Sequence, residues 1–151
     1  MIKIKKMNLE DFEKIKENLQ KDFDDFWKPS ILKSELESKD SIYIVAKKDE
    51  EIIGFAGIKI FPDDIEIMNI VTKKIERKKG IGKLLLDKII EISRKIEKEY
   101  ISLEVNEKNI IAISLYEKFG FKKIGFRKKY YNGIDNAIIM RKKIKNKFMS
   151  K

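Results

Sequence analysis

The stretch Arg77-Lys78-Lys79-Gly80-Ile81-Gly82-Lys83 lies between a predicted strand that ends near Thr72 and a predicted helix that begins after Gly80. Glycine lets the backbone approach a ligand closely and adopt turns that other residues avoid. The first N–H groups of a helix have no partner within the helix, and the positive end of the helix dipole lies beside them. A strand, a glycine turn and a helix start in this order therefore predict an anion-binding site.

Two phosphate-binding motifs do not fit this stretch. A Walker A loop ending at Gly82-Lys83 would need glycine at position 77 and a hydroxyl at position 84, where the chain has Arg77 and Leu84. A dinucleotide fingerprint starting at Gly80 would need a small residue at position 85, which is Leu85. The sequence therefore argues against nucleotide hydrolysis and nicotinamide binding. A lysine-rich loop without a ligand remains the alternative.

Hydrophobic periodicity and turn residues predict the element order βααβββαβαββ. The predicted strands are residues 2–6, 41–47, 51–61, 65–72, 100–105, 121–131 and 135–144. The predicted helices run from Asn8 to about Phe23, from a Ser30 cap through Glu37, from Gly80 to about Ile96, and from Asn109 to Gly120, with Ile111, Ala112, Leu115, Tyr116 and Phe119 on the inner face of the last. This order indicates an α/β fold with a mixed, mostly antiparallel sheet of about seven strands flanked by about four helices.

Length and composition set further limits. Residues 1–144 are predicted to form a single domain and residues 145–151 a basic tail, in a chain of 151 residues with a net charge of +10. Because no run of about 18 apolar residues occurs, we expect a soluble cytoplasmic protein without a membrane partner. The chain has no cysteine and no histidine, which excludes thiolate nucleophiles, imidazole bases and the usual zinc sites. Acid–base chemistry must therefore use carboxylate, tyrosine, lysine or water, and no metal is expected.

The pattern Arg-x-x-Gly-x-Gly, preceded by a strand and followed by an apolar helix, resembles the acetyl-CoA signature of the GNAT superfamily. The similarity continues toward the C-terminus. The matching segments are Leu103-Glu104-Val105, Asn109, Ala112-Ile113-Ser114-Leu115-Tyr116-Glu117, Phe119-Gly120-Phe121, Tyr130-Tyr131 and Ala137-Ile138-Ile139-Met140. Together they resemble the bacterial ribosomal-protein alanine N-acetyltransferases, the RimI family, from about residue 69 to residue 140.

The resemblance implies acetyl-CoA as the cosubstrate. In that family the pyrophosphate lies on the backbone amides of the glycine turn, the pantetheine pairs with the preceding strand, and a side chain at the start of a later helix contacts the coenzyme. The matching residues of this chain are Ile70, Val71, Thr72, Arg77, Lys78, Lys79, Gly80, Ile81, Gly82, Lys83, Asn109 and Tyr116.

Glu104 matches the proposed general base of the family. In an alternating strand Leu103 and Val105 share one face and leave Glu104 on the other. A free amine is the nucleophile that a thioester needs, so a carboxylate that takes a proton, directly or through water, is the expected base. The alternative is that Glu104 points to solvent.

Tyr116 matches the proposed general acid of the family. It lies one turn after Ala112, and its hydroxyl can give a proton to the leaving thiolate. A backbone N–H near Val71 is the candidate donor to the oxyanion of the tetrahedral intermediate. The alternative for Tyr116 is an ordinary core tyrosine.

Trp27, Tyr130 and Tyr131 are the acceptor-binding residues that the resemblance implies. The chain departs from the family where the peptide binds: Asp135-Asn136 replaces Glu-Asp, and residues 26–30 replace a short aromatic-Pro-Trp-Ser stretch. These departures concern the acceptor and leave acetyl transfer untouched. Two ordinary hairpin aromatics are the alternative for the tyrosines.

The chemistry of the amine favours an α-amine as the acceptor. At pH 7, deprotonation costs roughly 1.4 kcal/mol for an α-amine with a pKa of about 8 and about 4.6 kcal/mol for a lysine near 10.4. The resemblance points to the N-terminus of a ribosomal protein, with alanine first. Acetylation of a small-molecule amine or of a lysine side chain is the alternative.

A non-catalytic nucleic-acid-binding module is a more distant alternative. Residues 126–131 combine three basic with three aromatic side chains, which suits phosphate contact and base stacking. Only four of the basic residues are arginines, and we interpret most of the positive charge as a solvated surface. We therefore do not expect nucleic acid as a partner, and we expect a monomer or a weak homodimer.

Overall fold

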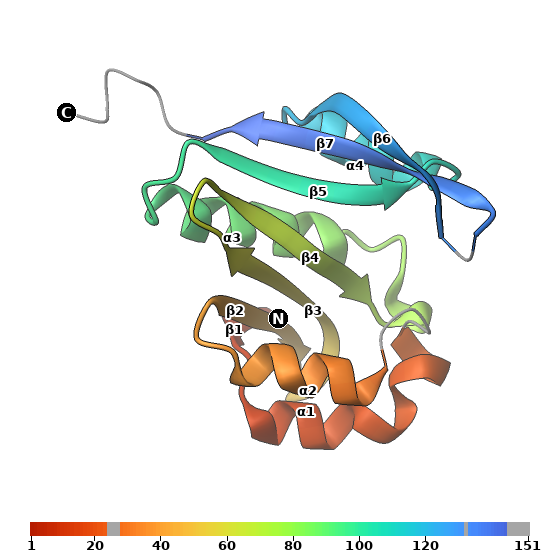
Figure 1. The fold of residues 1–151 in the computed structure, drawn as a ribbon. Coiled ribbons are helices and arrows are strands. Elements are labelled where there is room, and N and C mark those ends of the chain that lie inside the picture. The colour runs from red at the N-terminus through yellow and green to blue at the C-terminus, as the bar shows by residue number, and fades with distance from the viewer. Residues whose placement is uncertain (24–27, 132, 145–151) are drawn as a thin grey trace. The chain divides into compact units, whose positions relative to one another are not determined.

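The computed structural model describes residues 1–23, 28–131 and 133–144, with the side chains of all of these except 129–131. The strands are β1 Ile2–Lys6, β2 Ser41–Lys48, β3 Glu51–Ile60, β4 Asp64–Thr72, β5 Tyr100–Asn106, β6 Lys122–Tyr131 and β7 Asp135–Lys143. The helices are α1 Leu9–Ile15, α2 Pro29–Glu37, α3 Ile81–Arg94 and α4 Ile110–Lys118, with short helical turns η1 Lys16–Asn18, η2 Leu19–Phe23 and η3 Lys74–Glu76. The predicted order of strands and α-helices is confirmed (Figure 1).

The seven strands form one sheet in the order β1-β2-β3-β4-β5-β7-β6. The β1–β2, β2–β3, β5–β7 and β6–β7 pairs are antiparallel, and β4 pairs in parallel with β5 from Asp64↔Tyr100 to Ile67↔Leu103. The mixed, mostly antiparallel sheet is therefore confirmed. By its contacts the chain divides into two compact units: unit 1 is Met1–Ile60 with Met68–Glu91, and unit 2 is Phe61–Ile67 with the chain from Ile92 onward.

In unit 1 a buried apolar cluster joins the N-terminal helices to the sheet. Figure 1 shows α1 and α2 side by side. The rings of Phe23 and Phe55 lie 5.8 Å apart, and Leu32 of α2 is fully buried. The cluster consists of Met7, Phe12, Ile15, Leu19, Phe23, Leu32, Tyr43, Val45, Ile52, Phe55 and Val71.

The helical run after Asn8 changes its winding at Ile15. The Asn8 side chain accepts from the Asp11 N–H at 2.8 Å, and the Asp11 carboxylate accepts from the Asn8 N–H at 3.0 Å, which fixes the start of α1 as predicted. The chain then tightens in η1 and widens in the π-helical η2. Ile15, Leu19 and Phe23 are buried at steps of four residues. Four residues of a regular α-helix turn about 40° beyond a full circle, so buried residues spaced by four would move gradually around the helix. The wider π-helical turn of η2 turns less per residue, which helps to keep all three on one side.

The start of α2 corrects one prediction. α2 begins at Pro29, after Lys28 in an extended conformation, and Ser30 is already inside the helix. A serine hydroxyl is a common helix cap, which is why Ser30 was the expected one. Proline at the first helical position is equally favourable, because its φ is fixed at a helical value and its missing N–H has no partner there anyway.

α3 packs against β3 at Gly54. A Cβ added to Gly54 would lie 2.9 Å from the Val71 carbonyl oxygen and 3.1 Å from the side chains of both Ile81 and Leu85. Successive residues of a strand face opposite sides, so with Phe55 in the α1–α2 cluster, Gly54 faces α3. The absence of a side chain thus lets the first turns of α3 lie directly on the sheet.

α3 ends at Arg94, two residues before the predicted Ile96. The N–H groups of Lys95 and Ile96 bond to carbonyls three residues back instead of four, and Glu97 takes a φ of +62°. The helix therefore ends in a tight turn that its apolar periodicity did not indicate.

In unit 2, α4 begins at the predicted cap. The Asn109 side chain accepts from the Ala112 N–H at 3.1 Å. The predicted inner face is wrong at Ile111, which is 80% exposed, whereas Ile113 is 8% exposed and buried. All four residues from Ile110 to Ile113 are apolar, so polarity could not indicate which of them faces inward.

Replacing Gly54 with alanine should destabilise the protein. The added methyl group meets a backbone carbonyl and two packed side chains, and overpacking of this kind costs about 1–3 kcal/mol. Gly125→Ala is the matched control, because its Cβ would meet only the Ile139 side chain at 3.8 Å. Urea unfolding checks both variants, and an equal midpoint for Gly54→Ala and the wild type would contradict this account of the α3 contact.

Candidate functional site

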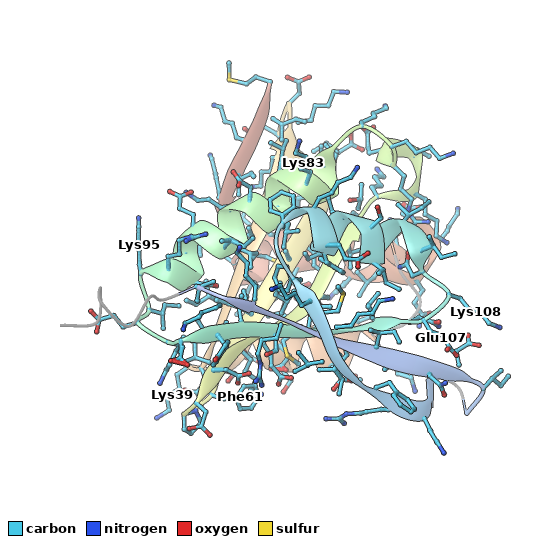
Figure 2. The ribbon with its side chains drawn as sticks, turned by 90° about the horizontal axis from the view of Figure 1, so that it is seen from above. Lys39, Phe61, Lys83, Lys95, Glu107 and Lys108 are labelled. Carbon is cyan, nitrogen blue, oxygen red and sulfur yellow. The ribbon has the colours of Figure 1, made fainter. Side chains whose placement is uncertain are left out.

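The predicted anion-binding turn connects η3 to α3 in unit 1. Lys78 has a φ of +66° and Gly80 a φ of +84°, and α3 begins at Ile81. The Leu84 N–H bonds to the Gly80 carbonyl at 3.1 Å, so the N–H groups of Ile81, Gly82 and Lys83 precede the first intrahelical bond. Apart from Ile81, the turn is exposed or half-buried. Figure 2 labels Lys83 on this first turn. The turn therefore has the free donors and the access that an anion needs.

Two charged side chains of this turn have structural partners. The Arg77 guanidinium donates to the Phe23 backbone carbonyl at 3.1 Å, at the end of η2. Lys79 lies 3.4 Å from the Glu76 carboxylate. Neither side chain is held toward the start of α3. The predicted contribution of Arg77 and Lys79 to cofactor binding therefore comes from their backbone groups and from their positive charge.

The C-terminal half of β4 leads into this turn. Its ladder with β5 consists of four pairs and ends at Ile67↔Leu103, although β4 continues to Thr72. Val71 is 4% exposed, whereas Ile70 and Thr72 are half-buried. Residues 70–72 thus lie beyond the part of β4 that pairs with β5.

Glu104 of β5 lies on a polar face of unit 2. Its Oε1 is 3.0 Å from Nε of Arg127, and its side chain is 18% exposed. On the same face the Ser102 hydroxyl donates to the Asp64 carboxylate at 3.0 Å, and Asn106 donates to Asp135 at 3.1 Å. The predicted alternation of β5 is therefore present. Glu104 is largely buried in an ion pair, and the solvent-facing alternative is wrong.

Glu66 is a carboxylate that sequence reasoning missed. It pairs with Ser102 in the parallel β4–β5 register, which places both side chains on the face of Glu104. Burial, Asp64 and Glu104 all raise the pKa of Glu66. No local sequence signal indicates this neighbour, because strand alternation alone does not reveal the register between β4 and β5.

Tyr116 is enclosed on α4. Its ring packs edge-on against Phe121 with the ring centres 5.8 Å apart, and burial raises the pKa of its hydroxyl to about 12. The phenol therefore keeps its proton at neutral pH, as a general acid must. Its edge-on packing also fits the alternative of a core tyrosine.

The remaining predicted site residues are Asn109, Trp27, Tyr130 and Tyr131, and the structure describes only part of this set. The carbonyl oxygen of the exposed Asn109 side chain is used in the α4 cap, so this predicted coenzyme contact has a structural role of its own. Tyr130 and Tyr131 belong to β6, but their side chains, like all of Trp27, lie outside the described residues.

Two absences hold for the part of the chain that the structure describes. No group of three or more acidic side chains there is placed to hold a metal ion. No helix in these residues is long and apolar enough to cross a membrane.

Comparison with known families and sequences gives consistent results. Residues 7–121 match the family described as the acetyltransferase (GNAT) family. A Bacillus subtilis protein, provisionally named a ribosomal protein bS18-alanine N-acetyltransferase, is 36% identical over 140 residues, which cover 91% of this chain and 92% of that protein. A Mycobacterium tuberculosis protein named N-alpha-acetyltransferase RimI is 32% identical over 112 residues, covering 72% of this chain and 69% of that protein.

Solved structures show the same fold. The ribosomal-protein-S18-alanine N-acetyltransferase from Escherichia coli superposes with a TM-score of 0.88 at 25% identity, over 97% of this chain and 96% of that one. The structure of Arabidopsis thaliana NAA60 in complex with acetyl-CoA has a TM-score of 0.80 at 21% identity, over 95% of this chain and 99% of that one.

Tyr116 should make the fold sensitive to alkaline pH. An unfolded tyrosine ionises near pH 10, so the raised pKa stabilises the fold fully below pH 10, and this contribution is lost as the pH rises toward 12. We expect the free energy of unfolding to fall less between pH 10 and 12 in Tyr116→Phe than in the wild type. Urea unfolding at several pH values measures this, and equal losses in both proteins would refute it.

Proposed function

Because the chain belongs to the GNAT family of acetyltransferases, we propose that it transfers acetyl from acetyl-CoA to the N-terminal α-amine of a protein, with a ribosomal protein beginning with alanine as the favoured acceptor. The observation that carries the proposal is the exposed turn at the start of α3, where the N–H groups of Ile81, Gly82 and Lys83 precede the first intrahelical bond. The names of the Bacillus, Mycobacterium and Escherichia relatives support the choice of acceptor. A ribosomal substrate implies a cytoplasmic location.

The proposal assigns coenzyme binding to unit 1. The backbone of residues 78–83 holds the pyrophosphate, because a helix N-terminus offers both free donors and a positive dipole end. The pantetheine pairs with Ile70, Val71 and Thr72 of β4, which lie beyond the ladder with β5. Arg77 is the remaining proposed contact in unit 1. Asn109 and Tyr116, the other two proposed coenzyme contacts, belong to unit 2.

The proposal assigns proton transfer to unit 2. Glu104, directly or through water, takes a proton from the acceptor ammonium, and the free amine attacks the thioester carbonyl carbon. The Val71 N–H stabilises the oxyanion of the tetrahedral intermediate. As the carbon–sulfur bond breaks, the Tyr116 hydroxyl gives its proton to the leaving thiolate. The nitrogen of the intermediate then loses its second proton to the Tyr116 phenolate, which leaves the neutral amide, coenzyme A and a protonated Tyr116.

The acceptor can be identified with short peptides. Incubation with acetyl-CoA and peptides that differ only in their first residue should give acetylated products, and a peptide beginning with alanine should react fastest. An N-blocked peptide containing lysine is the control and should react far more slowly, because lysine has the larger deprotonation cost. Mass spectrometry reads the products. Acetylation of the blocked peptide alone, or of small amines alone, would overturn the proposed acceptor.

The catalytic pair can be separated from coenzyme binding. Glu104→Gln should lower kcat/KM by about 10²–10⁴-fold, the usual contribution of general base catalysis, and Tyr116→Phe should lower kcat. Glu104→Gln should bind acetyl-CoA with the wild-type Kd. Tyr116→Phe removes one proposed contact with the coenzyme but no donor from the turn at residues 78–83, so its Kd should change far less than its kcat. Steady-state rates and calorimetry measure the two effects, and an unchanged rate in either variant removes that residue from the mechanism.

A further inference from the structure

Arg127 and Glu104 reach each other across an intervening strand. Arg127 of β6 is opposite Ala137 of β7, and Glu104 of β5 is opposite Ile139 of β7. Positions 137 and 139 share one face of β7, so the arginine and the glutamate lie on that face as well. They are two strand spacings apart and offset by two residues along the strands, roughly 12 Å in all, which only a long side chain can bridge.

A small residue lies beneath the path of the arginine. Ala137 is fully buried and carries only a methyl group, so the Arg127 side chain can pass over β7 to Glu104. The resulting Nε to Oε1 distance is 3.0 Å. The Arg127 side chain is 59% exposed and that of Glu104 is 18% exposed. The attraction between the two charges is therefore largely offset by the cost of desolvating and ordering the two side chains, and the pair contributes little to stability.

On the side of β4, the charged groups near the Arg127–Glu104 pair are carboxylates. Burial and neighbouring carboxylates raise the pKa of Glu66, and Arg127 opposes that shift. A second arginine, Arg141 of β7, donates to the Ser102 hydroxyl at 3.2 Å and lies 4.0 Å from the Asp64 carboxylate. The charged groups on this face include Asp64 and Glu66 of β4, Glu104 of β5, Arg127 of β6, and Asp135 and Arg141 of β7, of which Asp135 is paired with Lys108.

We propose that Arg127 is a positioning residue that holds the Glu104 carboxylate in place for proton transfer. The inference rests on the proposed role of Glu104 as the base. A glutamate loses rotamer freedom when it is fixed, and the 3.0 Å contact with the Arg127 guanidinium fixes it before the acceptor arrives.

Removing the guanidinium should lower the rate without weakening coenzyme binding. Arg127→Gln should lower kcat/KM for the acceptor about tenfold, with the Kd of acetyl-CoA unchanged. Arg127→Lys keeps a cation on a long side chain and should return much of the lost rate.

Two further comparisons decide the proposal. Arg94→Gln removes the same charge from the end of α3 and should match the wild type in rate. In the Glu104→Gln background, Arg127→Gln should cost no more than about twofold, because it acts through Glu104. An Arg127→Gln enzyme with the wild-type rate, no recovery in Arg127→Lys, or full additivity with Glu104→Gln would overturn the proposal.

These outcomes are distinct from failure of the proposed function. If the wild type acetylates a small amine and no peptide, the acceptor assignment fails, and the same variants measured on that amine still test Arg127. If the wild type acetylates nothing, acetyl transfer itself fails.

Discussion

The close packing of α3 on β3 fixes the part of the molecule on which coenzyme binding depends. At Gly54 the side chains of Ile81 and Leu85 and the carbonyl of Val71 come so near that no Cβ has room. This contact places the first turn of α3 beside the last residues of β4. A helix start that offers free N–H groups is thereby held next to the strand segment proposed to pair with pantetheine.

The proposed proton transfer depends on the register of the strands β4, β5, β6 and β7. Parallel pairing of β4 with β5 aligns Glu66 with Ser102, and β7 carries the small Ala137 under Arg127. The ion pair with Arg127 holds the Glu104 carboxylate on the face that also carries Glu66, where Glu104 is the proposed proton acceptor. Burial raises the pKa of Tyr116 to about 12, so its hydroxyl is protonated at neutral pH, as the proposed general acid must be.

Much of the fold could be predicted from the sequence because its signals are local. The Asn8 and Asn109 caps, the glycine turn and the alternation of β5 each depend on residues a few positions apart. The Ser30 cap was wrong because two start signals, a serine and a proline, are adjacent. The inner face of α4 was wrong at Ile111 because its first turn is apolar all round.

The site could be predicted only where it depends on a local motif or on the family resemblance. Glu66 and the Arg127–Glu104 pair were missed, because they arise from contacts between strands distant in sequence. Arg127 is also one of the basic residues in the segment 126–131, on which the alternative of nucleic-acid binding depends. In the structure it is in an ion pair with Glu104.

The most direct test of the central claim is an amide NMR titration with coenzyme A. With nitrogen-labelled protein, the largest shifts should fall on the backbone N–H groups of residues 78–83 and on those of residues 70–72 as the ligand saturates. Saturable binding that leaves the signals of the α3 turn unmoved and shifts amides elsewhere would contradict the account.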